Sequence, residues 1–202
     1  MQSLSTSGYA DRAPDLLVRY EALDPAEVNA HWRALFAPPP ATVLDIGAGT
    51  GRDAAWLASL GYTVHAVEPT DPFRDAAMAL HPEPQITWGD DALPGLTTTR
   101  ASSETYDMVM LNAVWMHLDE AERTAAMPNL AALLTPKGRL YISLRHGPVP
   151  PGRRMFEVTA DETIALAAAH GLTPLQNLRS GSIQAENQNR GVEWTSLVFE
   201  AP

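Results

Sequence analysis

Short apolar runs, many of them rich in β-branched residues, alternate along the chain with stretches whose apolar residues recur at helical spacing. Strands are predicted for the short runs, at residues 43–46, 62–68, 85–88, 106–112 and 139–144. Helices are predicted for most of the stretches around them, at residues 25–36, 53–60, 71–80, 120–134 and 160–170. Such alternation indicates a parallel sheet with helices on both faces.

The later part of the chain departs from this regular alternation. Residues 172–178 and 192–200 predict a pair of strands joined by a polar loop, so the last strand runs antiparallel. Residues 97–105 are polar and lack a helical period, which predicts a short or missing helix before the fourth strand. Pro128 falls within the helix after that strand, and we expect it to kink the helix or to split it at Met127.

Capping residues mark the starts of three predicted helices. Asp24 directly precedes a proline at the first helical position. Asp119 with Glu122, and Thr159 with Glu162, have the spacing of capping boxes. These signals favour helix starts near residues 25, 120 and 160.

Three glycines at alternate positions follow the first predicted strand. Gly47, Gly49 and Gly51 lie between that strand and a helix that begins near Asp53. Glycine lets the backbone turn tightly and approach a ligand, and the first N–H groups of a helix are free to bind it. We expect a nucleotide-like small molecule here; the alternative is a glycine-rich turn without a ligand. The dinucleotide fingerprint G-x-G-x-x-G has a different spacing, which disfavours a pyrophosphate.

Glu68 ends the second predicted strand. It follows the last glycine at close to the ~20-residue spacing at which nucleotide-binding folds place an acid for a ribose hydroxyl. A carboxylate accepts hydrogen bonds from both ribose hydroxyls, so Glu68 suits a sugar without a 2′-phosphate. The alternative is an incidental surface glutamate at a strand end.

Composition limits the classes of function. The chain has 202 residues, 45% of them hydrophobic, which suits one globular domain with an ordinary core. A formal net charge of −10, with Lys137 as the one lysine, makes nucleic acid an unlikely partner. No cysteine is present, which excludes disulfides and thiolate metal sites, and no metal site is predicted. With neither a signal-peptide pattern nor a membrane-spanning run, we expect a cytoplasmic protein without a membrane partner.

The glycine turn, preceded by Asp45, resembles motif I of the class I S-adenosylmethionine-dependent methyltransferases. The elements that follow in the family's order are Glu68, the Asp90-Asp91 pair, Tyr106-Asp107 and the loop and strand at 134–140. Arg52-Asp53 after the last glycine is similar to a subgroup of small-molecule and tellurite-resistance-like methyltransferases. The resemblance implies a Rossmann-like three-layer α/β sandwich around a seven-stranded, mostly parallel sheet with its last strand antiparallel. It implies a methyltransferase domain at 25–202, and residues 1–24 are predicted to be an N-terminal arm or lid.

S-adenosyl-L-methionine is the cofactor that this resemblance implies, and S-adenosyl-L-homocysteine the product. In the family pattern an acid after the third strand accepts a hydrogen bond from adenine; we favour Asp90 over Asp91, and capping is the alternative role for either. Arg52 is implied to lie near the methionine carboxylate. The implied cofactor-binding residues are Asp45, Gly47, Ala48, Gly49, Gly51, Arg52, Glu68, Pro69, Asp90, Asp91, Ala92, Asn112 and Ala113.

Candidate catalytic and substrate-binding residues follow the fourth and fifth strands, whose carboxyl ends meet at the ligand edge of such sheets. His117 and His146 are candidates for a general base toward an oxygen or nitrogen nucleophile; the alternative for each is a structural histidine. The basic loop at 145–154 is a candidate substrate-recognition segment, with a solvated loop as the alternative, and Arg145 in it is a candidate for substrate binding. Arg190, in the polar loop between the last two strands, is another candidate. Trp115 is a further candidate for stacking on a substrate, against packing at the sheet edge.

Two other classes of function compete with a methyltransferase of a small molecule. One is a non-catalytic S-adenosylmethionine-binding sensor or partner subunit, which the polar residues at the reaction edge disfavour. The other is a nucleotide-dependent oxidoreductase, which the glycine spacing disfavours. Residues 112–115 lack the Asn/Asp-Pro-Pro-Tyr tetrapeptide of amino-directed DNA methyltransferases, so a DNA-base enzyme is disfavoured as well. The substrate, the methylated atom and the oligomeric state are left open.

Overall fold

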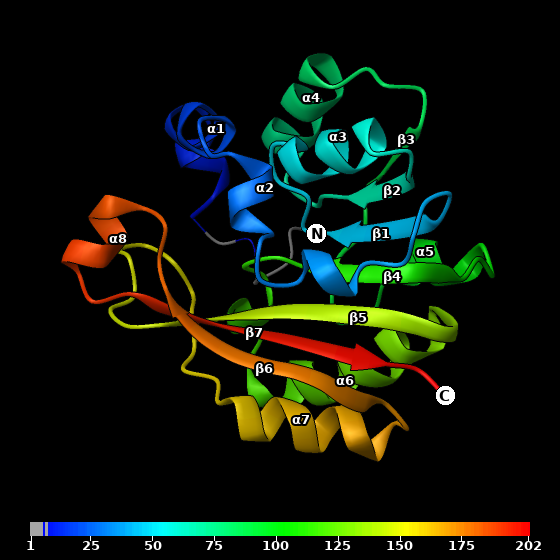
Figure 1. Cartoon of the computed structure of the whole chain (residues 1–202). Coiled ribbons are helices and arrows are strands. Elements are labelled where there is room, and N and C mark those ends of the chain that lie inside the picture. The colour runs from blue at the N-terminus through cyan, green and yellow to red at the C-terminus, as the bar shows by residue number, and fades with distance from the viewer. Residues whose placement is uncertain (1–5, 7) are drawn as a thin grey trace.

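The computed structural model describes residue 6 and residues 8–202 (Figure 1). Its strands are β1 (Thr42–Ile46), β2 (Thr63–Val67), β3 (Ile86–Gly89), β4 (Tyr106–Leu111), β5 (Leu134–His146), β6 (Thr173–Gly181) and β7 (Glu193–Glu200). Its α-helices are α1 (Ala13–Glu21), α2 (Pro25–Val28), α3 (Arg52–Ser59), α4 (Asp71–Leu80), α5 (Thr97–Ala101), α6 (Glu120–Ala132), α7 (Ala160–Ala169) and α8 (Ala185–Asn189). Short 3-10 helices are η2 (Ala10–Arg12), η3 (Arg33–Leu35) and η4 (Trp115–His117).

The strands form one seven-stranded sheet in the order β3-β2-β1-β4-β5-β7-β6. The first five strands in this order pair in parallel, and β7 is antiparallel to both β5 and β6. The predicted sheet, with its last strand reversed, is therefore confirmed. Because the parallel strands point the same way, their carboxyl ends meet at one edge of the sheet, where ligands bind in folds of this kind.

Alternate residues of the central strands enter two separate apolar layers. Val43 of β1 and Met108 of β4 pack on the side of α3, whereas Leu44 and Val109 pack on the side of α6 and α7. This follows from the pleat of a strand, which turns successive side chains to opposite faces. In Figure 1 the helices accordingly lie on both sides of the sheet. None of the helices among the described residues is both long and apolar enough to cross a membrane.

The start of the chain differs from prediction. The helix predicted at 25–36 is only the four-residue α2, although Asp24 caps it as expected, its Oδ1 accepting from Ala26 N–H at 2.8 Å. The Asn29 side chain ends α2, because Nδ2 donates to the Pro25 carbonyl and Oδ1 accepts from Trp32 Nε1. Part of the predicted arm folds instead as η2 and α1; residues 1–5 and 7 lie outside the described residues.

Three further local predictions need correction. α6 runs through Pro128 without splitting, since buried residues on either side of the proline hold it against the sheet. The predicted loop before the fifth strand is a bulge inside β5, with Leu134 opposite Tyr106 and the pairing resuming at Arg139. Thr159 caps α7, but the second half of that capping box does not form, because Glu162 binds Arg123 of α6 instead.

Candidate active site

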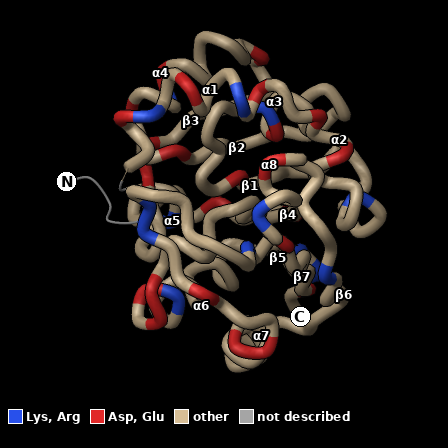
Figure 2. Tube along the Cα trace, turned by 90° about the vertical axis from the view of Figure 1, so that its left-hand side faces the viewer, with Lys and Arg blue, Asp and Glu red and all other residues tan. Residues whose placement is uncertain are grey.

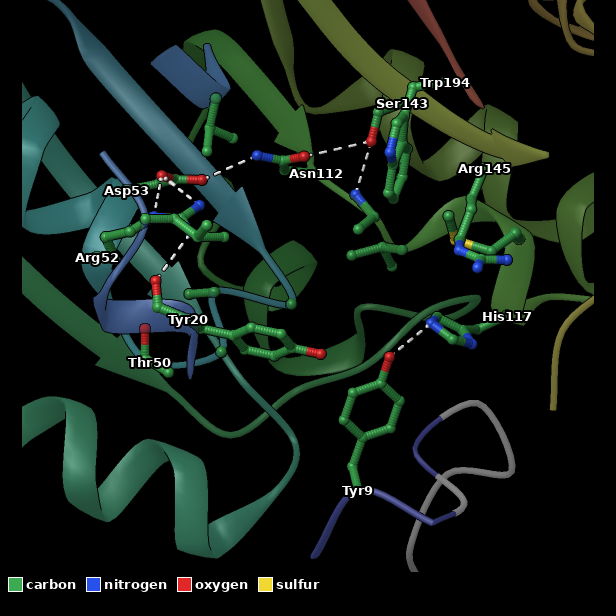
Figure 3. Close-up of a pocket in the computed structure, with 18 of the residues that line it drawn as sticks. Tyr9, Tyr20, Thr50, Arg52, Asp53, Asn112, His117, Ser143, Arg145 and Trp194 are labelled. Atoms are coloured by element: carbon green, nitrogen blue, oxygen red, sulfur yellow. Dashed lines mark hydrogen bonds and ion pairs between the residues drawn. The ribbon is translucent and has the colours of Figure 1, made fainter. Parts of the chain in front are cut away.

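A cavity of about 480 Å³ opens at the carboxyl ends of the parallel strands. Its walls come from the loops after β1, β2, β3, β4 and β5, from residues 9–32, and from the turn between β6 and β7 (Figure 3). Its volume lies within the range of ~300–1,000 Å³ that is usual for small-molecule sites. Eleven of the predicted cofactor-binding residues line it: Asp45, Gly47, Ala48, Gly49, Arg52, Glu68, Pro69, Asp91, Ala92, Asn112 and Ala113.

The glycine turn presents its backbone to this cavity. Gly49 has a φ of +59°, and a Cβ added there would meet no atom closer than 3.9 Å, so the space in front of it is open to a ligand. Gly51 serves a different purpose from the one predicted. It lies outside the cavity lining, and a Cβ there would come within 2.7 Å of the Trp88 ring, so this glycine is required for packing.

Glu68 lies at the end of β2, where its buried carboxylate spans two backbone groups. Oε2 accepts from Gly49 N–H at 2.9 Å, and Oε1 accepts from Thr70 N–H at 2.8 Å. Burial raises the pKa of Glu68, although these hydrogen bonds and the charge of Arg74 act in the opposite direction. The carboxylate thus bridges the glycine turn and the start of α4 at the place predicted for a ribose acceptor.

Asp45, at the end of β1, is a second buried acid of the cavity. Its Oδ2 has no hydrogen-bond partner among the described residues. Burial, with the nearby charge of Asp53, raises the pKa of Asp45 to about 8, and Arg52 only partly opposes this. Asp45 is also part of the cavity lining, so a cationic or hydrogen-bond-donating group of a ligand is a suitable partner for this buried carboxyl group.

Arg52 ties the glycine turn to the N-terminal segment. Its Nε and Nη2 bind Asp53 Oδ1 at 2.9 and 2.8 Å, and its Nη1 donates to the Tyr20 carbonyl at 3.1 Å (Figure 3). Asp53 in turn accepts from Asn112 Nδ2 at 2.9 Å. Ser143 of β5 links this network to the loop after β4, because its hydroxyl accepts from Ala113 N–H at 2.7 Å. The loops after β1 and β4 are therefore held together by side chains that face the cavity.

The two adjacent aspartates after β3 have separate roles. Asp91 accepts from the backbone N–H groups of Ala92, Thr97 and Thr99 and from the Thr99 hydroxyl, so it organises the start of α5. The Asp90 side chain is 68% exposed, faces Arg74 at 3.4 Å, and does not line the cavity. The preference for Asp90 as the adenine acceptor therefore has no geometric support, and Asp91 fulfils the capping alternative.

We expect Asp91→Ala to lower the free energy of unfolding by about 1–3 kcal/mol, because several buried N–H groups lose their acceptor. Asp90→Ala should change it by no more than about 0.5 kcal/mol, since the pair with Arg74 is exposed. Urea denaturation of both variants measures the difference. Equal losses of stability in the two variants would contradict these assignments.

His117, at the end of η4, points its ring toward the cavity. Nδ1 lies 2.7 Å from the Arg154 carbonyl oxygen, which can only accept, so Nδ1 carries the proton of the neutral ring. Nε2 is then an acceptor, and Tyr9 donates its hydroxyl to it at 2.9 Å (Figure 3). Burial lowers the pKa of His117, and the charges of Arg153, Arg145 and Arg154 lower it further. The ring is neutral at pH 7, with a basic nitrogen at the cavity wall.

His146 and Trp115, in contrast, do not reach the cavity. His146 is enclosed between Glu157 Oε1 at 2.8 Å from Nδ1 and Thr195 Oγ1 at 2.9 Å from Nε2. Trp115 is fully buried in the core on the side of α6, which is the packing role given as its alternative. The tryptophans in the cavity lining are instead Trp32 and, from β7, Trp194. Of the predicted substrate residues, Arg145 and Arg190 do line it.

Several lining residues lie far from any recognisable motif. Tyr9 and Tyr20 come from the N-terminal segment, and Arg153 from the loop after β5; Arg153 donates to both tyrosine hydroxyls, at 3.1 and 3.2 Å. The Arg153 guanidinium also stacks over the Tyr9 ring, 4.3 Å from its centre. Arg153 belongs to the basic loop at 145–154 that the sequence marks for substrate recognition, whereas the signal for the two tyrosines was only that aromatic residues occur in a segment otherwise expected to be an arm.

Comparisons with known proteins agree with this geometry. A family model described as a methyltransferase domain matches residues 20–198. A malonyl-[acyl-carrier protein] O-methyltransferase of Halalkalibacterium halodurans is 32% identical over 113 residues, 52% of this chain and 39% of that protein. A glycine N-methyltransferase of Mus musculus is 28% identical over 147 residues, 61% of this chain and 50% of that protein. The chain thus spans half or less of the length of these curated relatives.

Solved methyltransferase structures share the fold. A Burkholderia thailandensis 1,6-didemethyltoxoflavin-N1-methyltransferase with bound S-adenosylhomocysteine superimposes with a TM-score of 0.70 at 23% identity, over 96% of this chain and 84% of that one. Magnesium protoporphyrin IX methyltransferase from Synechocystis, also with bound S-adenosylhomocysteine, superimposes with a TM-score of 0.73 at 18% identity, over 96% of this chain and 97% of that one. A TehB-like enzyme of Corynebacterium glutamicum gives 0.63 at 22%, over 96% of each chain. The chain therefore belongs to the methyltransferase-domain family, as predicted, and has the fold of the class I S-adenosylmethionine-dependent methyltransferases.

Proposed function

We propose that the chain transfers a methyl group from S-adenosylmethionine to an oxygen or nitrogen atom of a small molecule, with His117 as the general base. The observation that carries this proposal is the orientation of His117, whose Nδ1 is fixed on the Arg154 carbonyl while Nε2 is left basic. When bound, the cofactor supplies a methyl group on a positively charged sulfur, which a correctly aligned electron pair can attack. The protein then has to bind, align and remove a proton.

The residues after β1 and β2 fit this cofactor. The open face of Gly49 admits a close ligand, and Glu68 is an acceptor for ribose hydroxyls. The buried, unpartnered oxygen of Asp45 suits a cationic group of the cofactor. Asn112 and Ala113, held by Asp53 and Ser143, complete the wall on the side of β4.

Tyr9 gives the proton a path to His117. Its hydroxyl donates to His117 Nε2 and accepts from Arg153 Nη1, so it can pass its own proton to Nε2 as it takes one from the substrate. Burial raises the pKa of Tyr9 well above its ordinary value, which disfavours a lasting phenolate. The tyrosine therefore acts as a relay, and the proton comes to rest on His117.

We further propose that the N-terminal segment, residues 8–24, is the lid of this site. Leu16 and Ala13 of α1 pack on Phe73 of α4, and Tyr9 reaches His117 from the opposite wall. Closing such a segment excludes water from the reacting atoms. The segment is thereby part of the active site as well as a cover.

The charge distribution supports a small-molecule substrate over nucleic acid. Acidic residues lie on the flanking helices α2, α4, α6 and α7, as Figure 2 shows along the trace. Such a surface repels a phosphate backbone. A cytoplasmic location remains the prediction made from the sequence.

Calorimetric titration with S-adenosylhomocysteine tests the cofactor site. We expect Glu68→Ala to weaken binding of S-adenosylhomocysteine by about 1–3 kcal/mol, because the ribose hydroxyls of the ligand lose the acceptor proposed for them. Glu193→Ala, which removes an exposed glutamate outside the cavity, should bind as the wild type does. A screen of small molecules for methyl transfer follows. Failure of the wild type to bind the cofactor product would refute the proposal, and binding without transfer to any acceptor would favour a sensor.

A further inference from the structure

Among the charged residues of the cavity lining, three acids and a basic region of three arginines lie at different places, whereas Arg52 pairs with Asp53 and Arg19 pairs with Glu186. The acids Asp45, Glu68 and Asp91 lie at or after the ends of β1, β2 and β3. The arginines Arg145 and Arg153 lie at and after the end of β5, and Arg190 lies in the turn before β7. This basic region stands out in a chain whose formal net charge is −10. It lies in the part of the cavity that the proposed cofactor site does not use.

None of these three arginines makes an ion pair with a carboxylate in the part of the chain that the structure describes. Arg145 is buried, and its Nη1 donates only to the carbonyl oxygens of Gly147 and Pro148, at 3.5 and 2.9 Å. Arg153 uses Nη1 and Nη2 for the two tyrosines, and its buried Nε has no hydrogen-bond partner among the described residues.

Other poorly exposed arginines of this protein are paired. Arg52 binds Asp53, and its side chain is only 15% exposed. Arg123, 5% exposed, binds Glu162. Arg154, 22% exposed, binds both Asp119 and Glu122. The fold thus supplies carboxylates to buried guanidinium groups elsewhere. Their absence around the basic region of the cavity indicates that the counter-charge comes from a ligand.

The three guanidinium groups also influence one another. Burial lowers the pKa of Arg145, and the charges of Arg190 and Arg153 lower it further. Glu157 opposes this weakly, but its exposed carboxylate is bound to His146. Like charges that converge on one cavity are stabilised by an anion that several of them share.

We propose that the substrate carries an oxyanion, a carboxylate or a phosphate, which Arg145, Arg153 and Arg190 bind. This inference rests on the proposed function and specifies its substrate class. The oxyanion lies near the atom that is methylated, because Arg153 and His117 share the hydroxyl of Tyr9 as hydrogen-bond partner. Arg145 lies close enough to lower the pKa of His117 as well.

The test uses the full chain saturated with S-adenosylhomocysteine and three probes of similar size: benzoate, phenyl phosphate and benzamide. Ligand-observed NMR titrations give the affinity of each. We expect at least one anion to bind tenfold or more tightly than the neutral amide. Preference for benzoate identifies a carboxylate, and preference for phenyl phosphate identifies a phosphate. Arg145→Gln and Arg190→Gln should each reduce the preference for the anion at least threefold.

Matched controls separate this inference from the proposed function. Arg190 is exposed at the cavity mouth, so its substitution leaves folding intact, and unchanged affinity for S-adenosylhomocysteine verifies both variants. Arg179→Gln, at an exposed arginine of β6 outside the cavity, should keep the full preference. Equal binding of all three probes, or a preference that survives both cavity substitutions, would overturn the anionic substrate. Loss of cofactor-product binding in the wild type would refute the proposed function instead.

Discussion

Replacing His117 by glutamine should lower the turnover of methyl transfer by about 10²–10⁴-fold, the usual contribution of a positioned general base. The glutamine amide can fill the space of the imidazole and keep a contact to Tyr9, but it cannot take up a proton at pH 7. Affinity for S-adenosylhomocysteine should stay close to that of the wild type, because His117 lies after β4, whereas Asp45 and Glu68 lie at and after the ends of β1 and β2. Formation of S-adenosylhomocysteine from S-adenosylmethionine, as the substrate found in the screen is methylated, measures the turnover.

The dependence of the rate on pH provides a second readout of the same variant. The base acts in its neutral form, and burial lowers the pKa of His117 below its ordinary value of 6.5. The wild-type rate should therefore be constant through neutral pH and fall only as the pH decreases through that lowered pKa. The residual activity of His117→Gln should lack this acidic decline.

His146→Gln is the matched control, since that ring is enclosed by Glu157 and Thr195 and lies outside the cavity. Tyr9→Phe tests the relay separately. It keeps the ring that packs on Phe73 and under Arg153, and removes only the hydroxyl. Full turnover of His117→Gln, or an unchanged acidic decline, would refute the assignment of the base.

Asp45→Asn should change stability and affinity in opposite directions. In the ligand-free protein, burial raises the pKa of Asp45 to about 8, so keeping this carboxyl ionised costs folding free energy. A neutral amide avoids that cost. We expect the free energy of unfolding at pH 8 to rise by at least about 1 kcal/mol, the equivalent of a single pKa unit. Binding of S-adenosylmethionine should weaken by about 3 kcal/mol, because its cationic group loses a buried anion.

The sign of the pH effect is fixed by the direction of the shift. A raised pKa means that the folded state binds more protons than the unfolded state between about pH 4 and pH 8. The contribution of Asp45 to wild-type stability therefore declines as pH rises through that window, and the two proteins should converge near pH 4. Urea denaturation between pH 4 and pH 8 measures the free energy of unfolding of both proteins. Asp90→Asn, which replaces an exposed acid, is the control. A variant that is less stable at pH 8 than the wild type would contradict this account.

Local patterns predicted the sheet and the cofactor end of the cavity. Strand and helix periodicity depends on which faces are buried, and the glycine turn with Glu68 is short in sequence and fixed in geometry. The same reasoning could not say which of Asp90 and Asp91 lines the cavity. That depends on how the backbone turns directly after β3, and neighbouring residues of one type give no sequence signal for it. Nor could this reasoning find that Gly51 is needed for contact with Trp88, a residue of a distant strand.

The basic end of the cavity was less accessible to such reasoning. Tyr9 and Arg153 meet only because the N-terminal segment folds across the loop after β5, and no local spacing encodes that contact. The two candidate histidines look alike in sequence, since each follows a strand. Their difference is tertiary: His146 lies beside β7, where Thr195 occupies its Nε2, whereas His117 lies on a 3-10 helix that faces the cavity.

The separation of acids and arginines in the cavity has a consequence for how such an enzyme can be re-engineered. The proposed cofactor contacts sit at and after the ends of β1, β2, β3 and β4, which are continuous with the core. The proposed substrate contacts sit on the N-terminal segment, the loop after β5 and the turn between β6 and β7, which are peripheral to it. Libraries confined to those peripheral segments can therefore change the accepted molecule while sparing the methyl donor site and most of the stability.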